Sequence, residues 1–250
     1  MSELAKATGG GYHYLPGVFQ YSAAVLADPE CEIERARLRQ PLPLANGFGI
    51  IEKHLGNIGR PLLAFCACEL RSPEPFTEAG FLAFNREYVS QLKTWGIFAD
   101  GCNPVARSNV CPEIQPPSAP SLYAFSYTVP RQSGELPSFH VAGSGEAPEG
   151  KANYRDHIVR LGDTSVDGLR EKARYVLGEM ERRMRAVGVG WSDVTTTQLY
   201  TVLDVFPVLA EDIVGRGATP GGLTWHFARP PVVGIDFEMD VRGVASEIVV

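Results

Sequence analysis

A single arginine stands in the segment NPVARSNV, residues 103–110, among small and β-branched residues that favour a strand. An arginine on the protein surface has no need of such neighbours. An arginine that binds a substrate carboxylate needs a fixed position, because its planar guanidinium meets the two carboxylate oxygens in parallel hydrogen bonds that lysine cannot copy. Arg107 is therefore a candidate for holding the carboxylate of a small-molecule substrate.

A second candidate lies near the end of the chain, in the segment GIDFEMDV, residues 234–241. Apolar and acidic residues alternate strictly there: Ile235, Asp236, Phe237, Glu238, Met239 and Asp240. This period of two predicts a strand with one buried face. A carboxylate in an apolar cleft has a raised pKa and can accept a proton from water, which makes Glu238 a candidate catalytic residue. The alternative is that the three acidic residues form a solvated face.

Helices and strands follow the same order in both halves of the chain, and these elements must position the two candidates. Apolar residues spaced by three and four predict helices at residues 44–59, 76–96, 166–187 and 206–215. Runs of β-branched and aromatic residues predict strands at residues 17–27, 60–70, 105–110, 121–129, 137–145, 194–205 and 230–244. The first half therefore reads strand, helix, strand, helix, strand, strand, and we expect the same order in the second half, where a single segment, residues 230–244, is predicted after the last helix; the residues themselves differ.

The two halves are joined by a segment, residues 129–138, whose Pro, Gly and Ser content is typical of a linker. Both halves have the size of an ordinary domain. We therefore expect two α+β domains, at residues 12–130 and 137–250.

Composition and motifs argue against several classes of function. A net charge of −6 without a basic cluster is unsuited to nucleic-acid binding, and no apolar run reaches the roughly 18 residues of a membrane span. The five cysteines and five histidines show no metal-ligand spacing, so we expect no metal. The glycine-rich stretches lack the context of nucleotide-binding motifs. The first ten residues contain no apolar signal core, which favours a cytoplasmic protein.

Several short motifs resemble the RidA/YjgF superfamily: ARSNV at residues 106–110, FHVAGSG at 139–145, VGVGWSDV at 187–194 and GIDFEMDV at 234–241. The resemblance covers nearly the whole chain as two tandem, divergent copies. It implies a chorismate-mutase-like α+β fold, with sheets packed into a barrel, helices outside, and clefts between neighbouring domains of a trimer. It also implies hydrolysis of enamines or imines to keto compounds and ammonia, without metal or organic cofactor. Some relatives are 2-aminomuconate deaminases, and others only bind small molecules.

The same resemblance suggests a role for each of the two candidates. In the superfamily, the arginine of the ARS motif binds the substrate carboxylate and a glutamate on the last strand helps to position water. Arg107 matches that arginine, but the last strand of the first half has no glutamate. Glu238 matches that glutamate, but the second half has no arginine at the matching position. We therefore expect one composite site, in which Arg107 anchors the substrate while Glu238 activates water.

Three further residues are candidates for substrate binding. Tyr21 lies where members of the superfamily often carry an aromatic residue that lines the pocket. Arg229, in TWHFARPP at residues 224–231, could replace the arginine that the second half lacks, or be an ordinary surface residue. His226 alternates with two aromatic residues and should face either a cleft or solvent.

The expected function is that of a cofactor-free hydrolase or deaminase acting on an unsaturated amino or imino acid. One alternative is a non-catalytic binding or regulatory module of the same fold, in which Arg107 and Glu238 would lie apart. An endoribonuclease is less consistent with the acidic composition. The expected partners are a small substrate with a carboxylate and other copies of the chain, most simply in a homotrimer, with neither nucleic acid nor membrane.

Overall fold

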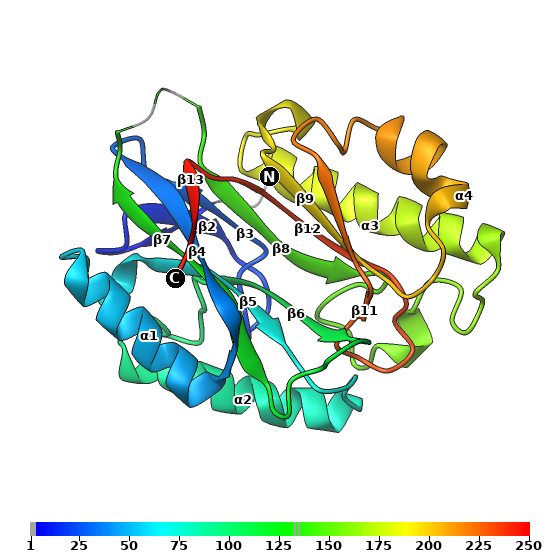
Figure 1. The fold of residues 1–250 in the computed structure, drawn as a ribbon, viewed down its shortest axis with the longest axis horizontal. Helices are drawn as coiled ribbons and strands as arrows, with labels where there is room; N and C mark the ends of the chain where they lie inside the picture. Colours follow the sequence, from blue (N-terminus) through cyan, green and yellow to red (C-terminus); the bar gives the residue numbers. More distant parts are fainter. Residues whose placement is uncertain (1–3, 133, 135) are drawn as a thin grey trace.

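The computed structural model describes residues 4–132, 134 and 136–250. Two β-sheets lie between two helical layers (Figure 1). Helices α1 (Leu44–Asn57) and α2 (Glu78–Thr94) cover one sheet, while α3 (Val166–Ala186) and α4 (Phe206–Val208) lie over the other. A π-helical segment, Leu209–Val214, extends α4, and short 3₁₀ turns occur at Leu62–Ala64, Arg155–His157 and Trp191–Asp193. The α+β class expected from the sequence is confirmed.

The two sheets are built around the same four-stranded arrangement. The six-stranded sheet has the order β11 (Ala228–Arg229), β6 (Ala106–Pro112), β5 (Phe65–Arg71), β7 (Ser121–Pro130), β4 (Cys31–Pro43), β13 (Ser246–Val249). The seven-stranded sheet has the order β1 (Ala5–Ala7), β2 (Tyr12–Leu15), β3 (Ala24–Ala27), β8 (Phe139–Gly145), β12 (Glu238–Gly243), β9 (Thr196–Tyr200), β10 (Leu223–His226). In both β4-β7-β5-β6 and β8-β12-β9-β10 the first two pairings are antiparallel and the third is parallel. The internal repeat inferred from the order of elements is therefore present in the sheets.

Strands at the two ends of the chain join the sheet of the opposite half. Strand β3 pairs with β8, so the N-terminal strands extend the second-half sheet. Strands β11 and β13 pair with β6 and β4 and extend the first-half sheet. Each sheet thus contains strands from both sides of the expected linker, and the division into domains at 12–130 and 137–250 stays a prediction.

The first strand of the first half differs from its sequence prediction. Residues 17–27 were expected to fill this place, but only Ala24–Ala27 forms a regular strand, and it belongs to the other sheet. The equivalent of β8 is instead β4, whose sequence CEIERARLRQPLP is too highly charged to resemble a buried strand. The buried charge of Arg35 in this strand is tolerated because it is paired, between the two sheets, with Glu69 of β5.

Apolar residues form separate layers on the outer face of each sheet. Helix α3 buries the stripe expected from its spacing: Leu169, Ala173, Val176, Leu177, Met180 and Met184. Ser165 caps this helix by accepting a hydrogen bond from the Gly168 N–H at 3.1 Å, and Gly188, at φ +79°, follows its end. Two charged residues of α3, Lys172 and Arg183, are also buried, which the periodicity did not indicate.

Candidate active site

Arg107 lies in β6, the strand between β11 and β5 in the six-stranded sheet, where it contacts β8 of the seven-stranded sheet. Its side chain is 3% exposed. Nη2 donates to Oδ1 of Asn85 on α2 at 2.7 Å, whereas Nη1 is buried with no hydrogen-bond partner among the described residues. Within that part of the chain, Arg107 also forms no ion pair. Burying a guanidinium without a partner of opposite charge costs folding free energy, so its presence here suggests a role other than stabilising the fold.

Aromatic rings surround the Arg107 guanidinium. The distances from its central carbon to the ring centroids are 5.3 Å for Tyr21, 5.8 Å for Phe81, 5.5 Å for Phe84 and 4.8 Å for Tyr88. Three of these rings come from α2, whose turns present residues three and four apart to the same strand. Cation–π attraction offsets part of the desolvation of the charge without satisfying its N–H groups.

Glu238 begins β12 and is 5% exposed. Its carboxyl group lies over Gly143 of β8, where a Cβ atom would collide with Oε1 of Glu238. Burial raises the pKa of Glu238 well above its usual range, and the negative charges of Asp240 and Glu146 raise it further. In the described chain, the carboxyl group has neither a hydrogen bond nor an ion pair with another side chain.

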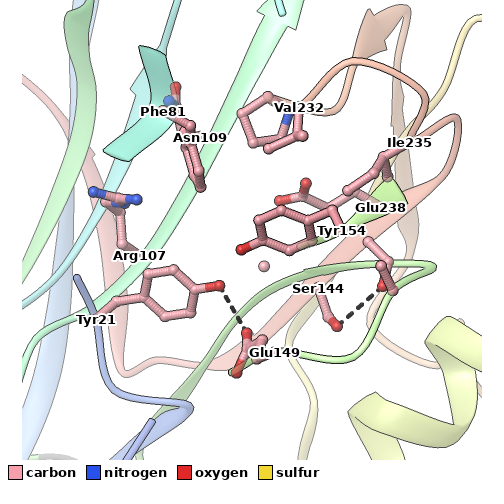
Figure 2. Close-up of a pocket in the computed structure, with 14 residues that line it drawn as sticks. Tyr21, Phe81, Arg107, Asn109, Ser144, Glu149, Tyr154, Val232, Ile235 and Glu238 are labelled. Atoms are coloured by element: carbon pink, nitrogen blue, oxygen red, sulfur yellow. Dashed lines mark hydrogen bonds between the residues drawn. The ribbon is translucent and has the colours of Figure 1, made fainter. Parts of the chain in front are cut away.

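The two candidates line one cavity (Figure 2). The space inside is about 40 Å³, enough for roughly three water molecules. Other lining residues are Tyr21, Phe81, Asn109, Ser144, Glu149, Tyr154, Val232 and Ile235. The structure therefore brings Arg107 of the first half and Glu238 of the second half to a common site, as the composite arrangement requires.

The solvated acidic face considered as an alternative for Glu238 is not present. Glu238 and Asp240 are buried because this face of β12 is directed at the other sheet. Asp240 accepts hydrogen bonds from Gln198 at 2.9 Å and from the Tyr200 hydroxyl at 2.7 Å. Asp236 forms a short ion pair with the buried Lys172. The alternation of residue types correctly indicated a strand, but Glu238 and Asp240 face the six-stranded sheet and not water, while Asp236 lies just before the strand and meets α3.

Tyr21 is fixed in the cavity wall by a chain of hydrogen bonds. Its hydroxyl donates to Oε1 of Glu149 at 2.7 Å, and the same oxygen accepts from Nη2 of Arg183 at 2.8 Å. Arg183 also donates from Nη1 to the carbonyl oxygens of Ala142 at 3.1 Å and Gly143 at 3.4 Å. Helix α3 thereby holds both the Tyr21 ring beside Arg107 and the strand on which Glu238 rests.

His226 and Arg229 do not line this cavity. The Nε2 atom of His226 lies 3.0 Å from Oε1 of Gln198, and its ring stacks on Tyr200 with centroids 5.0 Å apart. Burial and the nearby charge of Arg71 lower the pKa of His226 to about 4, so this ring is neutral near pH 7. Arg229 is exposed and pairs with Glu113 at 2.8 Å.

Sequence reasoning missed several residues of the site. Asn109 is two residues after Arg107, and on a strand this spacing puts both on one face. Its Oδ1 accepts from the Ser72 hydroxyl at 2.9 Å, while its buried Nδ2 has no hydrogen-bond partner in the described chain. Glu149 and Tyr154 come from the segment between β8 and α3, where no periodic pattern could have indicated their direction.

Two searches of the described residues concern other kinds of site. No group of three or more His, Cys, Asp or Glu side chains among them is arranged to hold a metal ion. No helix formed by them has both the length and the apolar character needed to cross a bilayer.

Comparisons with known proteins concern the family and the fold. The family model described as 2-aminomuconate deaminase CnbZ matches residues 4–248. A 2-amino-5-chloromuconate deaminase from Comamonas testosteroni is 52% identical over 250 residues, which is 100% of both chains. Among solved structures, a chorismatase is similar with a TM-score of 0.52 at 10% identity, covering 89% of this chain and 77% of its own. The Escherichia coli YjgF gene product has a TM-score of 0.31 at 16% identity, covering 43% of this chain and 80% of its own.

The protein is a deaminase-type enzyme with a RidA/YjgF-like fold, as the motifs of its sequence suggested. More closely, the chain belongs to the 2-aminomuconate deaminase CnbZ family.

Proposed function

We propose that this enzyme removes the amino group of an unsaturated amino dicarboxylic acid of the 2-aminomuconate type by hydrolysis, releasing ammonia and a keto acid. The observation that carries the proposal is the cavity shared by Arg107 and Glu238, two buried groups that lack partners of opposite charge within the described chain. The relative at 52% identity, whose description is that of a 2-amino-5-chloromuconate deaminase, supports this substrate class.

Arg107 binds the carboxylate next to the amino-bearing carbon. Its Nη1 has no hydrogen-bond partner in the described residues, and Asn85 holds Nη2 at 2.7 Å, so the orientation of the guanidinium is set before substrate arrives. A substrate carboxylate supplies both the missing negative charge and the missing acceptor. Such charge-assisted bonds are stronger than neutral ones and are stronger still away from water.

Glu238 acts first as an acid and then as a base. Its raised pKa favours the protonated carboxyl group in the free enzyme, and this form donates a proton to the enamine carbon and leaves an iminium group. The carboxylate formed in this step accepts a proton from water while the water oxygen bonds to the iminium carbon. The resulting carbinolamine carries a hydroxyl and an amino group on the same carbon.

The same carboxyl group completes the reaction. Glu238 donates its proton to the amino nitrogen, the carbon–nitrogen bond breaks with its electron pair on nitrogen, and ammonia leaves. The hydroxyl proton returns to Glu238 as the carbonyl forms. The balance is one enamine and one water converted to one keto acid and one ammonia, with Glu238 again protonated.

A dicarboxylic substrate needs more space than the cavity at Arg107 offers. Phe81 and Tyr154 also line a neighbouring hollow of about 460 Å³, and Asn85, the partner of Arg107, lines it as well. Lys151 contributes a positive charge to the lining of that hollow. We infer that the far end of the substrate, with its second carboxylate, extends in this direction.

A non-catalytic binding module was the alternative that the sequence left open. It expected Arg107 and Glu238 in separate clefts, whereas they line one cavity, and a site that only bound a carboxylate would gain nothing from a second, protonated carboxyl group beside it. These features support the catalytic proposal.

The test is ammonia release by the unmodified protein from 2-aminomuconate and from 2-aminoacrylate, which has a single carboxylate. We expect turnover of 2-aminomuconate with the higher kcat/KM of the two. Absence of ammonia release from both compounds, with the protein folded, would contradict the proposed function.

A further inference from the structure

Tyr154 places a phenol in the cavity from a loop that the sequence did not connect with the site. The residue lies between β8 and α3, just before the turn Arg155–His157, and is half-buried. Figure 2 shows its hydroxyl directed into the cavity on the side of Arg107 and Tyr21, with Glu238 beside its ring. The phenol therefore lies among the groups to which the proposed function gives the anchoring and proton-transfer roles.

The hydroxyl of Tyr154 is free to bind a ligand. It has no hydrogen bond to any of the described residues, whereas the neighbouring Tyr21 hydroxyl is engaged by Glu149 at 2.7 Å. Burial, with a contribution from the charge of Glu149, raises the pKa of Tyr154 to about 12. Near neutral pH the phenol therefore keeps its proton and is a hydrogen-bond donor.

Helix α2 holds Tyr154 and Arg107 in a fixed relation to each other. At the start of the helix, Oε1 of Glu78 accepts hydrogen bonds from the backbone N–H groups of Tyr154 at 3.0 Å and Arg155 at 3.1 Å. Two turns further along, Asn85 binds Arg107. Between them the Phe81 ring meets the Tyr154 ring edge to face, with centroids 6.4 Å apart. One rigid element thus positions both the carboxylate anchor and the phenol.

We propose that Tyr154 is a further catalytic residue, whose hydroxyl donates a hydrogen bond to the substrate nitrogen when water adds to the adjacent carbon. This inference rests on the proposed function, because it assigns a second group to the same reaction. The amino-bearing carbon is bonded directly to the carboxylate that Arg107 would hold, and the Tyr154 hydroxyl is directed to the Arg107 side of the cavity, so this hydroxyl is the donor placed to reach the substrate nitrogen.

The chemistry of the addition step explains what the donor would do. When the water oxygen bonds to carbon, the π electron pair of the carbon–nitrogen double bond moves to nitrogen. Before this step the nitrogen has no pair to offer, so a donor aimed at it stabilises the transition state more than the bound substrate. Tyr154 transfers no proton here, and Glu238 still supplies the proton with which ammonia leaves.

Tyr154→Phe tests the proposal, because it removes the hydroxyl and keeps the ring that contacts Phe81. We expect kcat for 2-aminomuconate to fall about 100-fold with KM changed less than about twofold. The variant Tyr175→Phe is a matched control, since Tyr175 is a half-buried tyrosine of α3 that does not line the cavity. We expect it to keep the kcat of the unmodified protein.

Tyr154→Ala separates the hydroxyl from the ring. We expect it to show the same loss of kcat together with a raised KM, because it also opens the wall between the cavity and the neighbouring hollow. An unchanged kcat in Tyr154→Phe, or a change in KM alone, would overturn the proposal while leaving the proposed function intact. Failure of the proposed function is recognised separately, by the absence of turnover in the unmodified protein.

Discussion

Arg107 and Arg35 are equally buried, each 3% exposed, yet their surroundings differ in one decisive respect. Arg35 donates to Glu69 from one edge of its guanidinium, at 2.6 Å from Nε and 2.9 Å from Nη2, and to Glu247 from Nη1 at 3.1 Å. Arg107 has a neutral amide at 2.7 Å and aromatic rings. The charge of Arg35 is thus satisfied within the protein, whereas the charge of Arg107 leaves room for the ligand carboxylate that we propose.

The carboxylates show the same difference. Burial alone would raise the pKa of Glu69, but the positive charges of Arg35 and Arg242 hold it well below its usual range. The pKa of Glu238 is raised by burial and by neighbouring acids, with Arg107 opposing this only weakly. The surroundings of Glu69 therefore favour its anionic form, whereas those of Glu238 favour its protonated form, which suits the role of proton donor that we propose.

Arg107→Met should produce the largest loss of activity. Methionine fills the aromatic cage without a charge, so the substrate carboxylate loses its anchor while the fold loses no ion pair. We expect kcat/KM for 2-aminomuconate to fall about 1000-fold and the free energy of unfolding in urea to stay within about 1 kcal/mol of the unmodified protein. A variant that unfolds far more easily would show that Arg107 is a structural residue.

Arg35→Met is the matched change at the ion pair between the sheets, and it should reduce stability while largely preserving activity. It leaves Glu69 buried without its main partner, which typically costs about 3–5 kcal/mol of unfolding free energy. Activity per folded molecule should remain within a few-fold, because Arg35 does not line the cavity. Loss of activity at full stability would mean that the region between the sheets takes part in the reaction.

Gly143→Ala should have an intermediate effect on activity. The added methyl group would occupy the position of Oε1 of Glu238 and press on Cβ of Ser108 at 3.0 Å, so the carboxyl group must move. We expect kcat to fall about 10-fold, in line with misplacement of a general acid. Gly178→Ala on α3 has open space around the new methyl group and should keep full activity. Equal activity of the two variants would contradict the position assigned to Glu238.

Glu238→Gln removes the group that transfers protons in the proposed reaction, so turnover should be lost, but its effect on stability should be the smallest of those predicted here and depends on pH. Since the folded pKa of Glu238 is raised, the unfolded chain loses this proton first, from near pH 4.5 upward. The unmodified protein therefore loses stability as pH rises from there to the folded pKa, and the glutamine variant does not. Urea unfolding at several pH values should show the variant gaining relative to the unmodified protein as pH increases. If the variant instead gained stability relative to the unmodified protein as pH decreased, the pKa of Glu238 would be lowered by folding and not raised.

The sequence indicated the two main candidate residues of the cavity but not the residues that hold the cavity wall in place. Arg107 and Glu238, which line one cavity in the structure, could be proposed because each stands in a motif that resembles the superfamily and because their chemistry is complementary. The sequence did not reveal Arg183, since a buried arginine on α3 resembles the exposed arginines beside it until its contacts with Glu149 and the carbonyl of Ala142 are known.

For the fold, the periodic helices were predicted well and the sheets less well. Strand β4 was missed because its charges are neutralised by strands far away in the chain, which no local pattern can indicate. The exchange of end strands between the sheets depends on tertiary pairing for the same reason. The homotrimer and the cytoplasmic location remain predictions.

A crystal structure with the keto or enol product of 2-aminomuconate bound would test the central claim most directly. We predict one product carboxylate within hydrogen-bond distance of Nη1 of Arg107, which has no partner among the described residues. The carbon that carried the amino group should then lie between Glu238 and the Tyr154 hydroxyl. A product bound elsewhere, with the Arg107 guanidinium still without a carboxylate, would contradict the account.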